Sequence, residues 1–514
     1  MPEGQQVLSR RRITVGSARA IDVHPLGCDV GFCAQDLDRA LFKPASVLAA
    51  TALGLLAACV LAVTSIPGVS RAFDYDGAMT VADFVRSPHL IDTFGHQSLF
   101  NNHPLFSFLE HLVGDVTGST SETTLRVLPI AFGAAAVGLV SALAARYRGL
   151  LPSVVCATAL LGNSLFVAEA REVRGYSLMV LCAVASTALL ARIVALREAH
   201  RWAAEVGYVL AVAAGLATHL YMVGVVVLQI ALVVGRREDL RPWAARWSVS
   251  VALSGCAYLV IAPAMLEAAQ KRSFLPGFPA ALVKQLGGGD WKLAVVLLPV
   301  AALGVLGFGK AARGAVAVGS LLVLIVPWLL LRSHLYPRFF LWALPGIAWL
   351  IGEAVARFRW SAAVLGVTVV ACTSSLRPTP NDAYAFRPAA QILRSASKSG
   401  FRICLLGNPD PLAAYVRPIA VARTADDVAR CDGVMWVAED ADAETLARAH
   451  AGFSHGLVLP ADLPGVVLYS RDFPGSELPW AGRCDTPIRL RRSPFIPPVR
   501  TGAPSASTSP LWRC

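Results

Sequence analysis

Long apolar runs, separated by short polar segments, occupy most of the chain between residues 44 and 375. Several runs reach the roughly 20 residues that a helix needs to cross a bilayer. The pattern therefore predicts an all-α polytopic membrane protein with about 11 transmembrane helices. We expect spans near 44–66, 125–145, 150–168, 175–196, 206–218, 220–234, 246–265, 291–309, 314–331, 338–356 and 360–375.

The apolar stretch 206–234 does not fit a single span. As one helix it would be about 43 Å long, too long for one untilted span and too short for two full ones. A single crossing would also put the basic clusters that follow it on the outer side, against the rule that Lys and Arg mark the cytoplasmic side. We therefore expect two short helices that meet at His219.

Composition supports the membrane assignment. The 514 residues are 55% hydrophobic and only 16% charged, against about 25% charged residues in soluble proteins. The net charge of +12 lies largely in short loops, where it indicates topology rather than nucleic-acid binding. We expect a multi-pass protein of the plasma (inner) membrane, with a cytoplasmic N-terminus and an extracytoplasmic C-terminal region.

The first 43 residues are polar and include Arg10, Arg11 and Arg12. A secretory signal has an apolar core within its first 30 residues or so. We therefore interpret 1–43 as a cytoplasmic segment and the first span as a retained anchor.

Residues 376–475 show a different pattern. The segments 401–407, 433–438 and 465–470 are short, apolar and typical of strands, with helical patterns between them. We expect a small extracytoplasmic α/β domain here, followed by a disordered tail at 476–514 that is rich in Pro, Ser and Arg. Four of the 11 cysteines lie in this region and allow three disulfide pairings, among which the sequence does not choose.

The polar segment 67–124 forms a large first outer loop directly after the first span. Loops carry chemistry more often than spans do. Asp74 and Asp76 stand near its start, where a carboxylate above the membrane could act as a general base or anchor a metal. The alternative is a pair of solvated loop acids.

Two histidines are candidate binding groups. His103 precedes Pro104, which favours the first turn of an amphipathic helix at the membrane interface. His219 lies at the outer turn between two short helices, and polar groups at membrane boundaries often mark sites. Either histidine could instead be structural.

Two cationic clusters lie at outer boundaries, against the inside bias. Arg171 and Arg174 open the fourth predicted span, and Arg332, His334, Tyr336 and Arg338 precede the tenth. Guanidinium groups match phosphate oxygens, so both clusters could bind an anionic lipid-linked substrate. Anchoring in lipid headgroups is the alternative.

The order of these motifs over about residues 44–345 resembles the GT-C membrane glycosyltransferases. The resemblance is to the PMT-like, family 39-like group, which includes protein O-mannosyltransferases, lipid A aminoarabinose transferases and Rgt-type lipopolysaccharide transferases. The matching segments are "DYDGAM", "HPL", "GSTSETTLRVLP" and "EVRGY".

The resemblance assigns roles to particular residues. Asp76 matches the Asp of the family's D-E-A motif, with Gly77 in place of its Glu; Asp74 is the candidate substitute for that second carboxylate. His103 and Pro104 match the H-P-P-L motif, in which Leu105 replaces the second proline. The other matched positions are Glu172, Arg174 and Tyr176 of E-x-R-x-Y, His219 after the short fifth helix, and Arg338 before a late span.

The family transfers a sugar from a polyprenyl-phosphate carrier to an acceptor at the outer face. The resemblance implies an inverting displacement with Asp76 as general base and with Arg174, Arg338 and His334 holding the phosphate. The acceptor could be a lipid, a glycan or a protein, and no nucleic acid is implied. Some relatives use a divalent metal; the sequence shows no convincing set of metal ligands, and metal dependence stays open.

Two other functions compete. A transporter or flippase for a lipid-linked saccharide would often show internal repeats and broken helices near the midplane. A non-catalytic scaffold that displays the outer domain would tolerate changes in 67–124. No repeat is visible, and the polar residues gather toward the outer face, which favours the enzyme.

Overall fold

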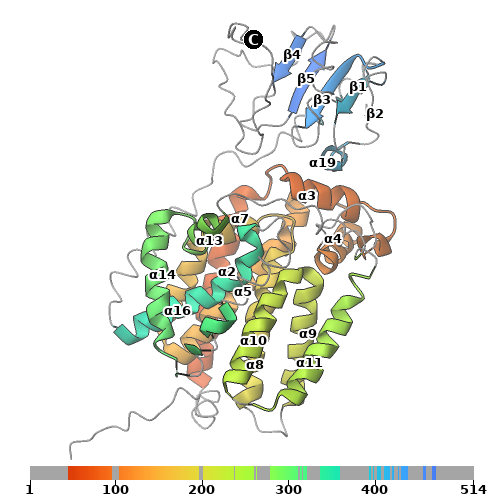
Figure 1. Ribbon diagram of the computed structural model, residues 1–514. Coiled ribbons are helices and arrows are strands. Elements are labelled where there is room, and N and C mark those ends of the chain that lie inside the picture. The colour runs from red at the N-terminus through yellow and green to blue at the C-terminus, as the bar shows by residue number, and fades with distance from the viewer. Residues whose placement is uncertain are drawn as a thin grey trace, which may run out of the picture.

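The computed structural model describes the bulk of the chain from residue 44 onward. The described residues are 44–94, 103–195, 201–236, 238–259, 262, 278–308, 336–358, parts of 310–320 and of 390–437, and the strands at 455–458 and 466–470. A bundle of helices forms the larger part, and a β-sheet lies beyond one end of it (Figure 1). The predicted cytoplasmic segment 1–43, the span 360–375, the tail 476–514 and most of the span 314–331 lie outside the described residues.

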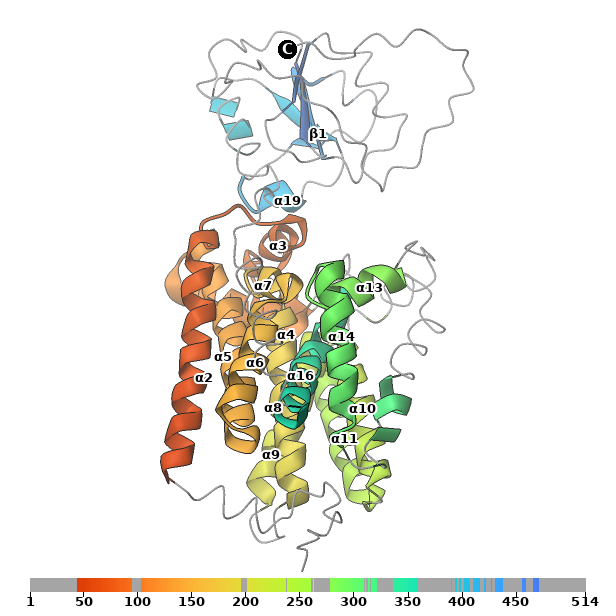
Figure 2. The same ribbon diagram turned by 90° about the vertical axis from the view of Figure 1, so that its left-hand side faces the viewer.

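Apolar helices confirm the predicted membrane protein. The bundle contains α2 (Pro44–Ser65), α5 (Glu122–Arg148), α6 (Leu150–Leu161), α8 (Tyr176–Ala195), α9 (Trp202–Thr218), α10 (Val223–Gly235), α11 (Leu240–Gly255), α14 (Trp291–Val305) and α16 (Leu344–Phe358) (Figures 1 and 2). Over the described ranges, four helical segments are long and apolar enough to cross a membrane: Val47–Gly68, Glu122–Arg148, Tyr176–Ala195 and Pro337–Phe358. A fifth candidate is the pair α13 (Phe278–Leu286) and α14, bent by 71°.

Capping residues explain where helices extend beyond the apolar runs. The Ser121 side chain accepts a hydrogen bond from the Thr124 N–H and starts α5 three residues before the expected span. Gly149, at φ +97°, ends it. Asp239 caps α11 by accepting from the Arg241 N–H, so that helix begins at Leu240 rather than near 246.

The expected span 150–168 is wrong as a single helix. The structure has α6 and then a separate short helix, α7 (Ser164–Glu169). Asn163 separates them because its side chain accepts a hydrogen bond from the Phe166 N–H and starts a new helix. The Gly162-Asn163 dipeptide is the local signal for this break.

The structure confirms the two helices expected in 206–234. The 3-10 turn η5 (Leu220–Met222) joins α9 to α10, with His219 at the junction. The Tyr208 hydroxyl of α9 donates a 2.7 Å hydrogen bond to the Gln229 side chain of α10, and the Trp247 indole of α11 donates to Tyr208 at 2.7 Å. These side chains could not meet along one straight helix, so α9 and α10 form a hairpin.

Small residues allow the first two long helices to approach closely. A Cβ at Gly54 of α2 would lie 2.6 Å from the Gly138 carbonyl oxygen of α5. Such contacts between small residues are a common way for helices to pack in membranes. The buried apolar cluster extends from these helices through α8 and α9 to the outer segments.

The first outer segment is largely helical. After η1 (Ile66–Gly68) come α3 (Tyr75–Thr80), the π-helical turn η2 (Val81–Val85), the 3-10 helix η3 (Leu90–Phe94) and α4 (Pro104–Thr117). Pro104 begins α4 as the sequence predicts, and Gly118 ends it at φ +62°. These helices lie at the end of the bundle that faces the β-sheet (Figure 1).

A five-stranded mixed sheet is present in the C-terminal part. Its strands are β1 (Ile403–Leu406), β2 (Ala420–Val421), β3 (Gly433–Val437), β4 (His455–Val458) and β5 (Val466–Ser470), in the order β2-β1-β3-β5-β4. The pairs β1–β2 and β1–β3 are parallel, and β3–β5 and β4–β5 are antiparallel. A disulfide joins Cys404 to Cys431, with 5.9 Å between their Cα atoms. The short helix α19 (Asp410–Ala413) lies between this sheet and the bundle (Figure 2).

Candidate active site

One end of the helical bundle brings together most of the residues that the sequence singled out. They lie at the starts or ends of different helices: Asp74 and Asp76 at α3, His103 at α4, Arg174 and Tyr176 at α8, His219 after α9, and Arg338 in the 3-10 helix η6 (Pro337–Ala343) that leads into α16. His334 lies outside the described residues, so its predicted role stays a prediction.

The Asp76 carboxylate is the meeting point of two arginines. Its Oδ2 lies 2.7 Å from Nη2 of Arg338 and 3.8 Å from Nη2 of Arg174. Burial raises the pKa of Asp76, but the positive charges of Arg174 and Arg338 outweigh burial and hold this pKa below its usual value. Asp76 is therefore a carboxylate at neutral pH.

Asp74 occupies a different environment two residues earlier. Its Oδ1 accepts a 2.6 Å hydrogen bond from the Gly77 N–H and caps α3. Burial, and next the charge of Asp76, raise the pKa of Asp74. The two carboxylates therefore have pKa values shifted in opposite directions.

Gly77 accounts for how Asp74 can sit there. A Cβ at position 77 would lie 2.5 Å from Oδ1 of Asp74, so a larger residue would displace the capping carboxylate. Gly77 thus allows a close fit of Asp74 against the start of α3.

Glu172 faces the same carboxylates from the turn before α8. Burial, followed by the charge of Asp74, raises the pKa of Glu172 well above its usual value. One of its oxygens lies 3.6 Å from Nη2 of Arg126. The Glu172 side chain therefore pairs with Arg126 and is influenced by Asp74.

His103 packs at the start of α8. Its Nδ1 lies 3.2 Å from the Thr218 carbonyl oxygen, and its ring centre lies 5.0 Å from that of Tyr176 and 4.9 Å from that of His219. This packing needs Gly175, since a Cβ there would lie 2.6 Å from Cγ2 of Thr218 and 3.0 Å from Nδ1 of His103. The glycine of the "RGY" segment therefore lets α4 and α9 approach α8.

Both histidines are neutral imidazoles. Burial lowers the pKa of His103 well below its usual value, and the charge of Arg174 lowers it further. Burial, with Arg174 and Arg338, lowers the pKa of His219 to about 3. Neutral imidazoles can each donate one hydrogen bond and accept another.

Aromatic rings surround the arginine of η6. The Arg338 guanidinium carbon lies 5.9 Å from the ring centre of Tyr176 and 5.0 Å from that of Tyr336. The ring centre of Phe339 lies 4.7 Å from that of Tyr221 and 5.2 Å from that of His219, in tilted arrangements. These contacts hold Arg338 in place next to Asp76.

Buried polar atoms without a hydrogen-bond partner over the described part of the chain gather in this cluster. Among them are Nε2 of His103 and the hydroxyl of Tyr176. Buried polar atoms are nearly always hydrogen-bonded in folded proteins. A bound polar ligand would satisfy both atoms.

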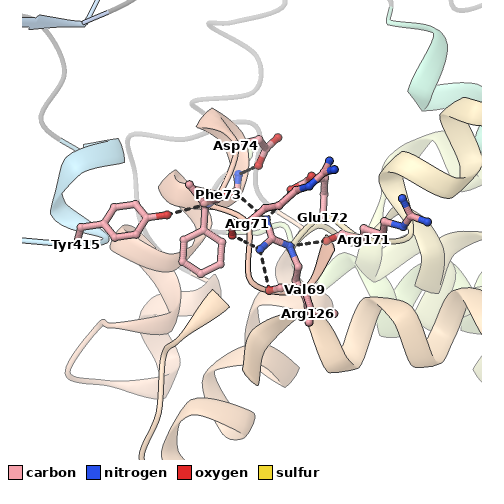
Figure 3. Close-up of polar contacts among 10 residues, drawn as sticks. Val69, Arg71, Phe73, Asp74, Arg126, Arg171, Glu172 and Tyr415 are labelled. Carbon is pink, nitrogen blue, oxygen red and sulfur yellow. Dashed lines mark hydrogen bonds and ion pairs between the residues drawn. The ribbon is translucent and has the colours of Figure 1, made fainter. Parts of the chain in front are cut away.

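Arg126 is an essential part of the site's framework that the sequence reading missed. It is fully buried and donates to the carbonyl oxygens of Arg171 at 2.8 Å and of Val69, Arg71 and Ala72 (Figure 3). These carbonyls belong to the chain just before Asp74 and to the turn that carries Glu172. The available signal was an arginine inside the apolar start of a span on the predicted outer side.

Two more buried acids were missed. Burial raises the pKa of Glu169, at the end of α7, to about 7, and Arg338 and Asp74 are its next strongest influences. Burial also raises the pKa of Glu110 in α4 well above its usual value. Glu169 stands three residues before the quoted segment "EVRGY", whereas Glu110 looked like an ordinary polar position of an amphipathic helix.

The Arg171 side chain lies against the end of α2. Its Nη2 donates to the Thr64 carbonyl oxygen at 2.9 Å and its Nε lies 3.4 Å from the Ser65 hydroxyl, both at the end of α2. Arg171 therefore satisfies one backbone carbonyl and one hydroxyl at a helix end. In the ranges that the structure describes, no group of three or more His, Cys, Asp or Glu side chains is arranged to hold a metal ion.

Similarity to solved structures identifies the architecture. The apo structure of ArnT from Cupriavidus metallidurans matches with a TM-score of 0.56 at 14% identity, over 82% of this chain and 98% of that chain. The same ArnT bound to undecaprenyl phosphate matches with a TM-score of 0.54 at 14% identity and the same coverage. No protein-family model and no curated protein sequence matches the chain. The chain therefore has the fold of the GT-C membrane glycosyltransferases, as the order of its motifs predicts.

Proposed function

We propose that this protein transfers a sugar from a polyprenyl-phosphate donor to an acceptor on the outer face of the membrane. The observation that carries the proposal is the cluster of Asp76, Arg174 and Arg338 at one end of a GT-C bundle. A fold neighbour, ArnT, has been solved with undecaprenyl phosphate bound. A lipid-borne donor needs no nucleotide-binding motif in the protein.

Charge at the helix ends supports an outward-facing site. Several helices have one end at the site and the other end far from it. Basic residues gather at those far ends: Arg146 and Arg148 of α5, Arg192 of α8, Arg236 after α10 and Arg357 of α16. Lys and Arg are enriched on the cytoplasmic side, which supports a site on the other face. The Cys404–Cys431 disulfide beyond the site suits an oxidising compartment.

The two arginines are suited to the donor phosphate. Their guanidinium groups both face Oδ2 of one carboxylate. As the sugar's C1–O bond breaks, the phosphate gains negative charge, which they would stabilise. Both pair with the Asp76 carboxylate. A phosphate that draws them toward itself would leave Asp76 less tightly paired.

Asp76 is the proposed general base. Its ionised carboxylate would take the proton from the acceptor hydroxyl as that oxygen attacks C1 from the face opposite the phosphate, and the configuration at C1 inverts. Release of Arg338 to the phosphate raises the pKa of Asp76 toward its ordinary value and makes it a stronger base. Donor binding would thus prepare the base for the second substrate.

The neutral histidines and Tyr176 suit the sugar itself. Nε2 of His103 and the Tyr176 hydroxyl are buried and lack partners among the residues described, so sugar hydroxyls could satisfy them. Asp74, bonded to the start of α3, would position Asp76 rather than react.

The direct test is transfer by purified protein in liposomes, offered a panel of polyprenyl-phosphate sugars with lipid, glycan and peptide acceptors. The proposal predicts a product heavier than one acceptor by one glycosyl unit, detected by mass spectrometry. A lipid-linked sugar that crosses the bilayer unchanged, with no glycosylated product from any pair, would favour the flippase alternative.

A further inference from the structure

The C-terminal region contacts the chain immediately before the two aspartates. The Tyr415 hydroxyl accepts a 2.7 Å hydrogen bond from the Phe73 N–H, and the two rings lie 5.8 Å apart (Figure 3). Phe73 is buried and directly precedes Asp74, which caps α3. A residue of the C-terminal region is thus one hydrogen bond away from the helix that carries Asp76.

Further contacts hold this part of the C-terminal region in place. Arg86 donates to the Ala413 carbonyl oxygen at 3.3 Å and to the Thr120 hydroxyl at 2.9 Å, and Arg394 donates to the carbonyl oxygen of Tyr415. Leu412 is completely buried and belongs to the same apolar cluster as Phe73. The segment around α19 is therefore packed onto the outer helices, as Figure 2 shows for α19 above α3.

Phe73 is held from its other side by Arg126. The Arg126 guanidinium lies 5.4 Å from the Phe73 ring centre and donates to three carbonyl oxygens in residues 69–72. Phe73 is thus fixed between α5 and the C-terminal region, and the position of its backbone sets where α3 begins.

We propose that Tyr415 is a positioning residue for the glycosyl transfer. Docked on Phe73, it fixes the start of α3 so that Asp76 stands where the acceptor hydroxyl arrives. The C-terminal region is then part of the active site rather than a separate appendage. This inference rests on the function proposed above.

Tyr415→Phe is the informative substitution because it keeps the ring contact and removes only the acceptor of the Phe73 N–H. We expect kcat to fall about tenfold, the size of one lost hydrogen bond, while the KM for the donor stays unchanged. The assay uses the polyprenyl-phosphate sugar that the wild-type protein transfers fastest. Arg394→Ala, at an exposed position, should lower kcat by a smaller factor, again with an unchanged donor KM.

Tyr208→Phe is the matched control. It also removes a hydroxyl that bonds to two side chains, the buried Gln229 and the partly buried Trp247, but it lies in α9, away from α3. We expect it to lower the thermal midpoint without changing kcat. This separates a loss of positioning from a general loss of stability.

The possible outcomes distinguish the two proposals. If Tyr415→Phe and Arg394→Ala both keep wild-type kcat beside an inactive Asp76→Asn, the positioning role is wrong and the proposed function stands. If Tyr208→Phe loses kcat as much as Tyr415→Phe, the effect follows stability and the positioning role is again wrong. Full activity of Asp76→Asn would instead reject the proposed function.

Discussion

The Asp76 carboxylate and the Arg338 guanidinium form a 2.7 Å ion pair, although α3 and η6 stand at opposite ends of the helical part of the chain. The same guanidinium is the group best placed to take a donor phosphate. The pairing therefore couples the proposed base to the proposed phosphate site, and substitutions at either residue should show that coupling.

Replacement of Arg338 should weaken donor binding. In Arg338→Ala the phosphate loses a charge-assisted hydrogen bond, and we expect the donor KM to rise about tenfold to hundredfold. The measurement is transfer rate against donor concentration in liposomes. Arg357→Ala is the matched control, because Arg357 lies on the same continuous helical segment at its far, exposed end. An unchanged donor KM in Arg338→Ala would refute the phosphate role.

The pH dependence of activity should reveal how Arg174 and Arg338 lower the pKa of Asp76. Because Arg174 and Arg338 hold the pKa of Asp76 below its usual value of 3.8, activity that needs the carboxylate persists at neutral pH and falls only as the pH drops through this lowered pKa. In Arg338→Ala the pKa of Asp76 rises, so the acidic limb of kcat/KM should move to higher pH.

Donor binding should produce a similar shift in the wild-type protein. The acidic limb of kcat reports the donor complex, in which a phosphate offsets the arginine charges, and that of kcat/KM reports the free enzyme. We therefore expect the acidic limb of kcat to lie at a higher pH than that of kcat/KM. If the acidic limbs of kcat and kcat/KM coincide, or if Arg338→Ala does not move the limb of kcat/KM, Asp76 is not the titrating group.

The arginine that holds the segment before Asp74 should matter for stability. Arg126→Met would leave the carbonyl oxygens of Val69, Arg71 and Ala72 buried without their donor, at a cost of about 3–5 kcal/mol. Thermal unfolding in detergent measures this. The control Arg192→Met changes an exposed arginine on the last turn of α8 and should be nearly neutral. Equal midpoints for the two variants would contradict the structural role of Arg126.

Hydrophobic patterning in the sequence predicted most of the described helices, but not the contacts between the helix ends. Apolar runs place α2 and α8 within a residue or two, and the charge argument correctly divides 206–234 at His219. The break at Asn163 escaped because a single capping side chain, rather than a change in hydrophobicity, ends α6.

The candidate site was likewise predicted only in part from the sequence. The order of the motifs identified Asp76, Arg174 and Arg338 as separate candidate residues. Hydrophobic periodicity carries no information on contacts between residues so distant in the chain. Arg126 escaped because a charged residue in the first turns of a span is usually an anchor. The contact of Tyr415 with Phe73 escaped because it joins regions that the sequence pattern treats as separate domains.

The central claim is that Asp76 is the base of a glycosyl transfer, and Asp76→Asn tests it most directly. Purified wild-type, Asp76→Asn and Asp115→Asn proteins would be compared for product formation in liposomes; Asp115 is an exposed acid of the same outer segment, with 65% of its side chain accessible. We predict that Asp76→Asn loses at least about a hundredfold in rate while it still unfolds in a cooperative thermal transition, and that Asp115→Asn matches the wild type. Transfer by Asp76→Asn at the wild-type rate would contradict the account.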